Sequence, residues 1–177
     1  MRVVTGIEQT FGSDEFIVSK TDPGGRITYA NHVFTRVSGY TAGELIGKPH
    51  NIVRHPSMPR GVFKLLWDEL AAGREVFAYV INLTKTGDHY WVFAHITPSF
   101  DPARKIVGFH SNRRTPNRAA IPAVTELYAQ MLQEEAKLSD RRAAAAASRG
   151  WLERTLAARS LTHEQLVFEL EGRRAAA

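Results

Sequence analysis

The segment from His50 to Pro59, which reads His-Asn-Ile-Val-Arg-His-Pro-Ser-Met-Pro, constrains the fold of this chain more than any other segment. Pro56 and Pro59 fix their φ angles and lack an amide donor. We therefore expect a rigid loop that neither continues as a helix nor pairs as a strand. The loop also carries two imidazoles, of His50 and His55, and the guanidinium of Arg54. A rigid, polar and basic loop of this kind predicts a ligand-binding site.

The residues before this loop predict a β-hairpin followed by two short helices. The turn Asp-Pro-Gly-Gly at 22–25 separates two apolar stretches, because proline sets one turn position and glycine permits a positive φ. Asn31 is a good N-cap for the first helix. Thr41 and Glu44 form a capping-box pattern at the start of the second. The predicted strands cover residues 15–20 and 26–29, and the predicted helices cover 31–39 and 41–47.

The residues after the loop predict one longer helix, three strands and a helical tail. Apolar residues recur at helical spacing from Val62 to Leu70. Two turns, at 86–88 and 101–104, divide the next stretch into an antiparallel meander with strands over 76–84, 89–99 and 105–112. From residue 117 onward Ala, Glu, Gln and Leu predominate, which predicts helices that begin at 117, 143 and 162.

Cysteine and long apolar runs are both absent from the chain. The lack of cysteine excludes disulfides, thiolate metal sites, thiol catalysis and cysteinyl–cofactor adducts. There is no run of about 18 apolar residues that would indicate a membrane span. The N-terminus carries acids where a signal peptide needs an apolar core. We therefore predict a cytoplasmic protein with no membrane span.

The formal net charge is +5, but the positive charge is spread thinly along the chain. Residues 1–116 hold 14 Lys and Arg against 10 Asp and Glu, and residues 117–177 hold 9 against 8. The short basic pairs at 113–114, 141–142 and 173–174 are interpreted as solvated surface. We therefore predict no nucleic-acid partner.

Motifs of catalysis are also absent from the sequence. There is no GxSxG elbow, no Gly-rich phosphate loop with a lysine, no kinase signature set and no HExxH spacing for zinc. We predict that the protein is not an enzyme and that it has neither catalytic residues nor a metal site.

Several short fragments follow one another in a characteristic order. They are Asp-Pro-Gly-Gly-Arg-Ile-Thr-Tyr-Ala-Asn at 22–31, Phe34, Ser-Gly-Tyr at 38–40, Glu-Leu-Ile-Gly at 44–47 and Gly-Asp-His-Tyr-Trp at 87–91. Together they resemble those of a PAS sensor domain. The resemblance implies an α+β fold, in which short helices cover one face of an antiparallel five-stranded sheet, plus a C-terminal α-helical extension. It implies an N-terminal segment over residues 1–11, the PAS sensor domain over 12–114 and the extension over 115–177.

The loop narrows the resemblance to one branch of this family. Residues 49–59 together with 87–91 are similar to the PAS domain of bacterial aerotaxis receptors, which bind FAD without a covalent link and report its redox state. The resemblance implies that Arg54 and His55 help to hold the cofactor and that Asn82 faces it. Arg54 offers a planar fork that suits phosphate oxygens. Asn82 can both donate to and accept from the polar edge of the flavin ring.

Other side chains near these motifs complete the predicted site. Aromatic residues such as Trp91 and Trp67 can form walls for a flat apolar ring, while Asn31 is most simply an N-cap. The full set of predicted cofactor contacts is Arg54, His55, Asn82, Trp91, His50, Trp67 and Asn31.

Two other interpretations of the pocket remain open. One is a cofactor-free interaction module whose own side chains fill the pocket. The other is a haem-binding gas sensor, which needs one axial imidazole, with His95 and His110 able to face inward from strands. The available histidines are His50, His55, His89, His95 and His110.

The helical tail carries an apolar stripe that must be covered. One face of the helix predicted over 117–138 carries Ile121, Val124, Tyr128, Met131 and Leu138. We predict a homodimer formed through the PAS domain and this tail, and a downstream signalling protein as the partner.

Overall fold

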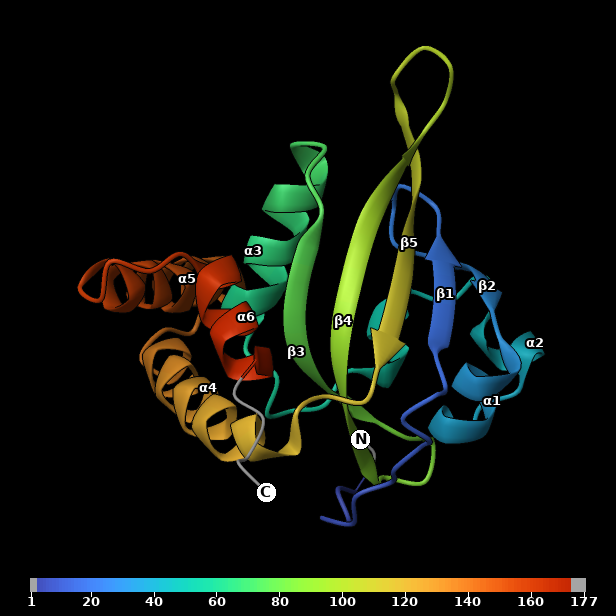
Figure 1. Ribbon diagram of the computed structural model, residues 1–177, viewed down its shortest axis with the longest axis horizontal. Coiled ribbons are helices and arrows are strands. Elements are labelled where there is room, and N and C mark those ends of the chain that lie inside the picture. Colours follow the sequence, from blue (N-terminus) through green and yellow to red (C-terminus); the bar gives the residue numbers. More distant parts are fainter. Residues whose placement is uncertain (1–2, 173–177) are drawn as a thin grey trace. The chain divides into compact units, whose positions relative to one another are not determined.

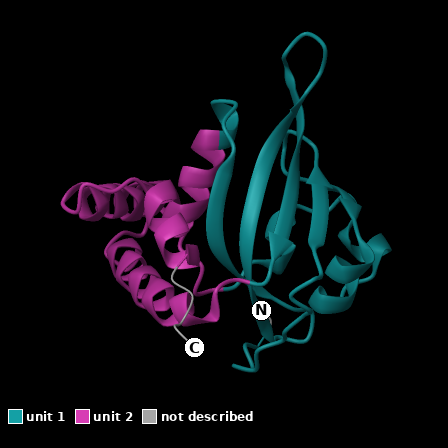
Figure 2. Cartoon of the chain, in the orientation of Figure 1, with its two compact units in different colours: residues 1–55, 70–115 teal, residues 56–69, 116–177 magenta. Residues whose placement is uncertain are grey.

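The computed structural model describes residues 3–172, and their contacts divide the chain into two compact units (Figure 2). The first unit runs as far as His55 and includes Leu70–Thr115. The second unit joins Pro56–Glu69 to the residues from Pro116 onward. This division is discontinuous, whereas our predicted boundaries at residues 12, 114 and 115 follow the order of the chain and stay a prediction.

The first unit contains a five-stranded antiparallel sheet with the strand order β2-β1-β5-β4-β3 (Figure 1). The predicted α+β architecture is therefore confirmed, including the N-terminal hairpin, the meander and the helical C-terminal region. The strands are β1 (Ile17–Thr21), β2 (Ile27–Ala30), β3 (Val76–Leu83), β4 (His89–Phe100) and β5 (Ile106–Arg114).

The register of β5 decides which side chains share a face of the sheet. Arg113 lies opposite Ile17 on β1 and opposite Ala94 on β4, and Ala94 lies opposite Ala78 on β3. Directly paired residues point to the same side, and successive residues alternate. We call the side that carries Ile17, Arg113, Ala94 and Ala78 the inner face, and the other side the outer face.

Two short helices follow the first hairpin, as the capping patterns predict. Helix α1 (His32–Ser38) begins after Asn31, whose side-chain oxygen accepts the amide of Phe34 at 3.0 Å. Gly39 ends it with a φ of 73°, a conformation that glycine adopts without strain. Helix α2 (Ala42–Leu45) begins with the capping box of Thr41 and Glu44.

The predicted non-helical and unpaired conformation of the His/Arg loop is wrong in two respects. His50–Val53 form a 3-10 turn, η1, in which the amide of Ile52 donates to Pro49 and that of Arg54 donates to Asn51. The backbone of Arg54 then forms an antiparallel bridge with Asn82 at the edge of β3. Pro56 and Pro59, which lack an amide donor, follow this turn in the sequence and therefore do not prevent it.

The segment before β1 also contacts the sheet. The amides of Thr5 and Gln9 donate to the carbonyls of Gly87 and His89, and the side chains of Thr5 and Gln9 donate to Asp88 at 2.6 and 2.8 Å. A side chain at Gly87 would collide with the backbone of Val3. Gly87 therefore permits the chain to lie close against the β3–β4 turn.

The second unit consists of helices that bury one another's apolar faces. Val124, Tyr128 and Met131 of α4 are buried, as their spacing predicts. Leu152 and Leu156 of α5 are buried as well. The elements are residues 60–69 of α3 (Arg60–Ala71), η2 (Arg118–Ala120), α4 (Ile121–Ala136), α5 (Arg141–Ala157) and α6 (His163–Gly172).

The carboxylate of Glu135 joins three helices of this unit. Glu135 lies on α4, is 4% exposed, and accepts hydrogen bonds from the amide of Gly61 at 3.0 Å and from the hydroxyl of Ser148 at 2.9 Å. Arg60 forms an ion pair with it at 3.1 Å. A Cβ on Gly61 would lie 2.6 Å from the amide nitrogen of Arg149, so glycine allows α3 and α5 to approach closely.

Across residues 3–172, none of the helices combines the length and the apolar character that crossing a lipid bilayer requires.

We expect Glu135→Ala to lower the free energy of unfolding by about 2–3 kcal/mol, because it leaves the buried amide of Gly61 without its acceptor and removes the ion pair with Arg60. Chemical denaturation measures this loss. Glu134→Ala is the matched control on the same helix, since Glu134 forms its ion pair with the more exposed Lys137. The control should change the free energy by no more than about 0.5 kcal/mol. Equal effects of the two substitutions would show that Glu135 does not hold the helices together.

Candidate functional site

The inner face of the sheet carries several of the buried polar side chains of the first unit. Ser19 and Arg113 lie on it beside each other, and Asn82 and Tyr90 share it through the alternation along β3 and β4. Helix α1 and the turn η1 cover this face, because Phe34 contacts Arg113 and His50 contacts Ser19. All of these side chains come from the first unit.

Arg113 is a buried cation without a carboxylate partner among residues 3–172. The residue is 3% exposed, and its Nη2 donates to the hydroxyl of Ser19. The central carbon of the guanidinium lies 4.5 Å from the centre of the Phe34 ring. Its Nε and Nη1 have no hydrogen-bond partner within the described part of the chain. Burial lowers the pKa of Arg113 to about 10, so the guanidinium remains charged at neutral pH.

His50 is uncharged beside this cation. Burial of its ring and then the charge of Arg113 lower the pKa of His50 to about 3. Its Nε2 lies 3.1 Å from the Ser19 hydroxyl, and its ring stacks on Phe34 with centres 5.8 Å apart. Ser19 accepts from Arg113, so its single proton is available to donate to the Nε2 of His50. The neutral form with its proton on Nδ1 satisfies this chain of hydrogen bonds.

Asn82 supplies a second buried polar group that the fold leaves incomplete. It is 4% exposed, and its Nδ2 has no hydrogen-bond partner among the residues that the structure describes. Buried amide groups normally have partners. The backbone bridge to Arg54 places the start of the loop beside Asn82. The structure therefore brings together Asn82, Arg54 and, on the same side of the sheet, His50.

His55 is buried but points into different surroundings. It is 6% exposed, and its ring centre lies 5.8 Å from that of His89. His89 pairs with Leu83, which the alternation places on the outer face. Burial, followed by the charge of His89, lowers the pKa of His55. The ring of His55 is therefore placed beside an outer-face side chain.

Three predicted contacts do not join the inner face. Trp91 pairs with Ile81 and lies on the outer face, because Asn82 and Tyr90 occupy the inner one. Trp67 lies on α3 in the second unit and is 43% exposed. The side chain of Asn31 accepts the amides of Val18 and Phe34 and donates to the carbonyl of Phe16, so it ties β1 to α1.

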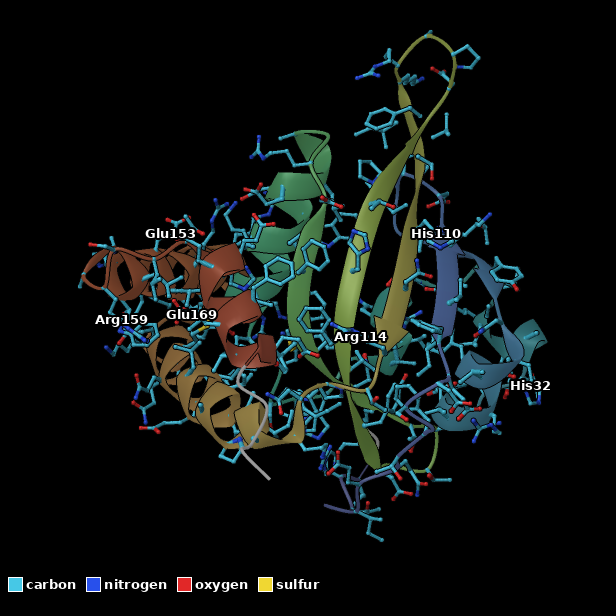
Figure 3. All side chains as sticks on the ribbon, viewed as in Figure 1. His32, His110, Arg114, Glu153, Arg159 and Glu169 are labelled. Atoms are coloured by element: carbon cyan, nitrogen blue, oxygen red, sulfur yellow. The ribbon has the colours of Figure 1, made fainter. Side chains whose placement is uncertain are left out.

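The histidines suggested as inward-facing haem ligands lie on the outer face. His95 pairs with Phe77 and stacks on its ring with centres 4.2 Å apart. His110, which is labelled on β5 in Figure 3, alternates with Ser111 and accordingly points away from the inner face. Of the two, His95 also contacts Glu75 at 2.7 Å. The prediction that these two strand positions face inward is wrong, because the register of β5 was not available from the sequence.

Sequence reasoning missed the contribution of Arg113. Together with Arg114 it was interpreted as a basic surface pair, yet only Arg114 is exposed, while Arg113 is buried. Adjacent strand residues point to opposite faces, so a pair of identical residues in a strand predicts that one of them lies inside. That alternation is the signal that could have identified Arg113.

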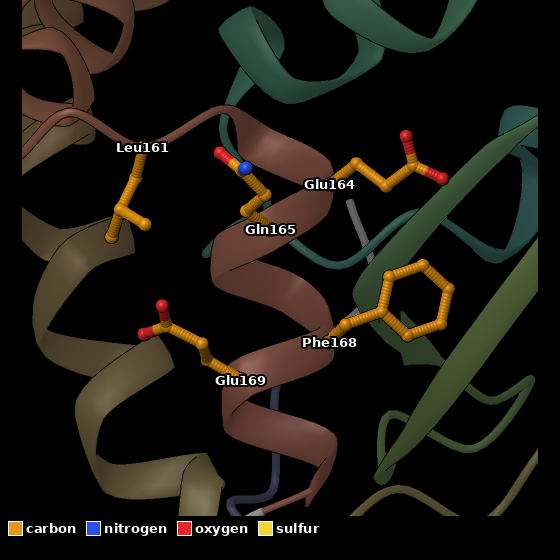
Figure 4. Close-up of a pocket in the computed structure, with 5 residues that line it drawn as sticks. All are labelled: Leu161, Glu164, Gln165, Phe168 and Glu169. Carbon is orange, nitrogen blue, oxygen red and sulfur yellow. The ribbon is translucent and has the colours of Figure 1, made fainter.

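An open pocket of about 500 Å³ lies along α6 in the second unit (Figure 4). Its lining holds two carboxylates and no cation, which does not suit a phosphate-bearing ligand. The lining residues are Leu161, Glu164, Gln165, Phe168 and Glu169. Across residues 3–172, no group of three or more His, Asp or Glu side chains is placed to hold a metal ion.

This chain is similar in sequence to a known protein family and to two bacterial proteins. Residues 8–112 match the family described as PAS fold. The aerotaxis receptor of Escherichia coli (strain K12) is 42% identical over 125 residues, which cover 71% of this chain and 24% of the receptor. A nitrogen fixation regulatory protein of Klebsiella pneumoniae is 28% identical over 97 residues, which cover 55% of this chain and 20% of that protein. The chain therefore matches about a quarter or less of the length of these relatives.

A solved structure shows the same fold at low sequence identity. A light-oxygen-voltage domain studied with a flavin analogue superposes with a TM-score of 0.55 at 20% identity, over 63% of this chain and 83% of that chain. At this level of identity the likeness concerns the fold alone.

We expect protonation of His50 to destabilise the protein in acid. The pKa of His50 is about 3 in the folded protein and near 6.5 when unfolded, so its stabilising effect is full above about pH 6.5 and declines as the pH falls. The loss should approach about 2 kcal/mol between pH 7 and pH 5. Unfolding by denaturant at both pH values measures it, and His50→Gln should lose less stability than the wild type over this interval.

His32→Gln is the matched control, because His32 lies exposed on α1 (Figure 3). This variant should retain the pH dependence of the wild type. If His50→Gln and the wild type lose stability equally between pH 7 and pH 5, His50 is not a buried neutral imidazole.

Proposed function

Because this chain belongs to the PAS family, we propose that it is a cytoplasmic redox or oxygen sensor that binds FAD non-covalently at the inner face of its sheet. The observation that carries this proposal is the pair of buried polar groups, Asn82 and Arg113, whose hydrogen-bonding capacity the fold leaves unmet. Buried groups of this kind are stable only with a partner. The similarity to the aerotaxis receptor supports a sensory role.

The chemical types of the inner-face residues match the parts of a flavin. The ring system of a flavin is flat and largely apolar, and its pyrimidine edge carries both donors and acceptors. Phe34 and the aliphatic inner-face residues provide apolar surface. The Nδ2 of Asn82 and the Nε and Nη1 of Arg113 are donors without hydrogen-bond partners among residues 3–172. Arg54, whose backbone adjoins Asn82, is the cation that we assign to the diphosphate.

A bound flavin supplies redox chemistry, because reduction adds charge or a proton to its ring. The chain's own residues would convert this change into a signal. The amide of Asn82 can present either an oxygen or an N–H to the ring, and Asn82 is coupled through its backbone to Arg54. A rearranged contact there would alter the loop that leads into α3. We propose that the output is a changed contact with a second copy of the chain or with a downstream signalling protein.

The first test is an absorption spectrum of the purified protein, followed by release and chromatography of any pigment. We expect flavin bands and the release of FAD. A Soret band would instead support haem, for which His50 is the inner-face imidazole. A colourless folded protein that takes up neither added FAD nor haem would support the cofactor-free interaction module and contradict the proposal.

We expect Asn82→Ala to weaken FAD binding at least about tenfold, because the hydrogen bonds to the ring edge are lost. Asn112→Ala is the matched control, since Asn112 lies on the outer face and contacts His110 at 3.2 Å. Fluorescence titration of the apo-protein with FAD measures both dissociation constants. Unchanged affinity in folded Asn82→Ala would remove Asn82 from the site.

We expect Arg54→Ala to weaken FAD binding by about 10- to 100-fold, the range of a hydrogen bond to a charged group. Lys48→Ala removes a nearby exposed cation and should leave the affinity unchanged. Comparing FAD with riboflavin separates the roles, because riboflavin lacks the diphosphate and should be insensitive to Arg54→Ala. A variant that loses FAD and riboflavin affinity equally would contradict the assignment of Arg54 to the diphosphate.

A further inference from the structure

We propose that Arg113 tunes the flavin site toward the reduced cofactor, by placing a buried positive charge where it neutralises the negative charge of a reduced flavin ring. This inference rests on the proposed function and deepens it, because it assigns the redox preference of the site to one residue. Arg113 is not part of the motifs that indicate the family, and only the register of the sheet reveals its place on the inner face.

The surroundings of Arg113 hold its side chain in one position. One edge of the guanidinium donates to Ser19, and its plane lies against the ring of Phe34 at 4.5 Å. Ser19 is itself engaged with His50 at 3.1 Å. The guanidinium is therefore fixed on two sides by groups that are themselves held by the fold.

The same surroundings leave the charge without compensation. Two of the three guanidinium nitrogens, Nε and Nη1, have no hydrogen-bond partner, and no carboxylate contacts Arg113 among residues 3–172. The residue is 3% exposed, so water does not solvate the charge freely. A buried arginine in this state destabilises the protein. The missing partner must be electron-rich or anionic.

The side chains of His50, Ser19 and Asn82 do not add a positive charge beside that of Arg113. His50 stays neutral, as the charge of Arg113 itself and the burial of the ring disfavour its protonation. Ser19 and Asn82 are uncharged. Arg113 therefore supplies a full positive charge to the inner face, and it retains this charge at neutral pH.

A flavin supplies the matching charge when it is reduced. Full reduction adds two electrons and, near neutral pH, one proton, which together leave one negative charge on the ring. A buried cation binds this anionic ring more tightly than the neutral oxidised ring. By linkage, tighter binding of the reduced form raises the midpoint potential of the bound flavin.

The test compares Arg113→Met with the wild type in two measurements. Methionine keeps a long flexible side chain and removes the charge. In the first measurement, the apo-protein of Arg113→Met should have a melting temperature equal to or higher than that of the wild type, because an uncompensated charge has been removed. In the second, a titration with dithionite as electron donor and water as proton source gives the midpoint potential of bound FAD.

We expect the preference for reduced over oxidised FAD to fall at least about tenfold in Arg113→Met, which corresponds to about 30 mV for a two-electron couple. In Arg113→Lys, which retains the charge, the preference for reduced over oxidised FAD should fall by less. Arg114→Met is the matched control, since Arg114 adjoins Arg113 on β5, is exposed and faces the other side (Figure 3). The control should retain the wild-type potential.

The results that would contradict the role of Arg113 differ from those that would contradict FAD binding. If the wild type binds FAD and Arg113→Met keeps its potential, Arg113 does not tune the site, while the flavin proposal stands. If Arg113→Met fails to fold or melts well below the wild type, Arg113 is a structural residue and the inference is wrong. If the wild-type protein binds no FAD, the proposed function and the inference fall together.

Discussion

The position of β5 between β1 and β4 joins the N-terminal hairpin and the later meander into one sheet. Without this pairing, Ser19 and Arg113, which lie 94 residues apart in sequence, would not meet. The alternation of side chains makes the pairing selective, because a shift of one residue would exchange the inner and outer faces. Arg113 would then be exposed and Arg114 buried. The register thus determines which charges the interior of the sheet contains.

Two buried charged residues, Glu135 and Arg113, differ in how far the fold satisfies their hydrogen-bonding groups. Glu135 accepts from the amide of Gly61 and the hydroxyl of Ser148 and pairs with Arg60, so its carboxylate is satisfied by the helices that it joins. Arg113 donates to one side chain and leaves two nitrogens unmet. A satisfied buried charge specifies packing, whereas an unsatisfied one lowers stability. The contrast is the physical basis for assigning a structural role to the first and a ligand role to the second.

The His/Arg loop connects these two parts of the molecule through the chain itself. At one end, Arg54 pairs with Asn82 at the edge of the sheet. A few residues later, α3 begins at Arg60, and both Arg60 and the amide of Gly61 are held by Glu135. Pro56 and Pro59 restrict the intervening backbone. The two units are therefore joined here by a short segment whose φ angles are fixed at two positions.

Local chemistry was enough to predict most elements of secondary structure. The caps at Asn31 and Thr41, the turns before β2 and β4, and the apolar spacing of α3 and α4 act over a few residues, so the sequence alone determined them. The motifs around the loop also determined the family. The sequence could not determine which strand neighbours β1, because pairing between distant segments depends on the whole sheet. Only the tertiary structure therefore placed Trp91 and His110 on the outer face and Arg113 on the inner one, and decided which polar groups lack a partner.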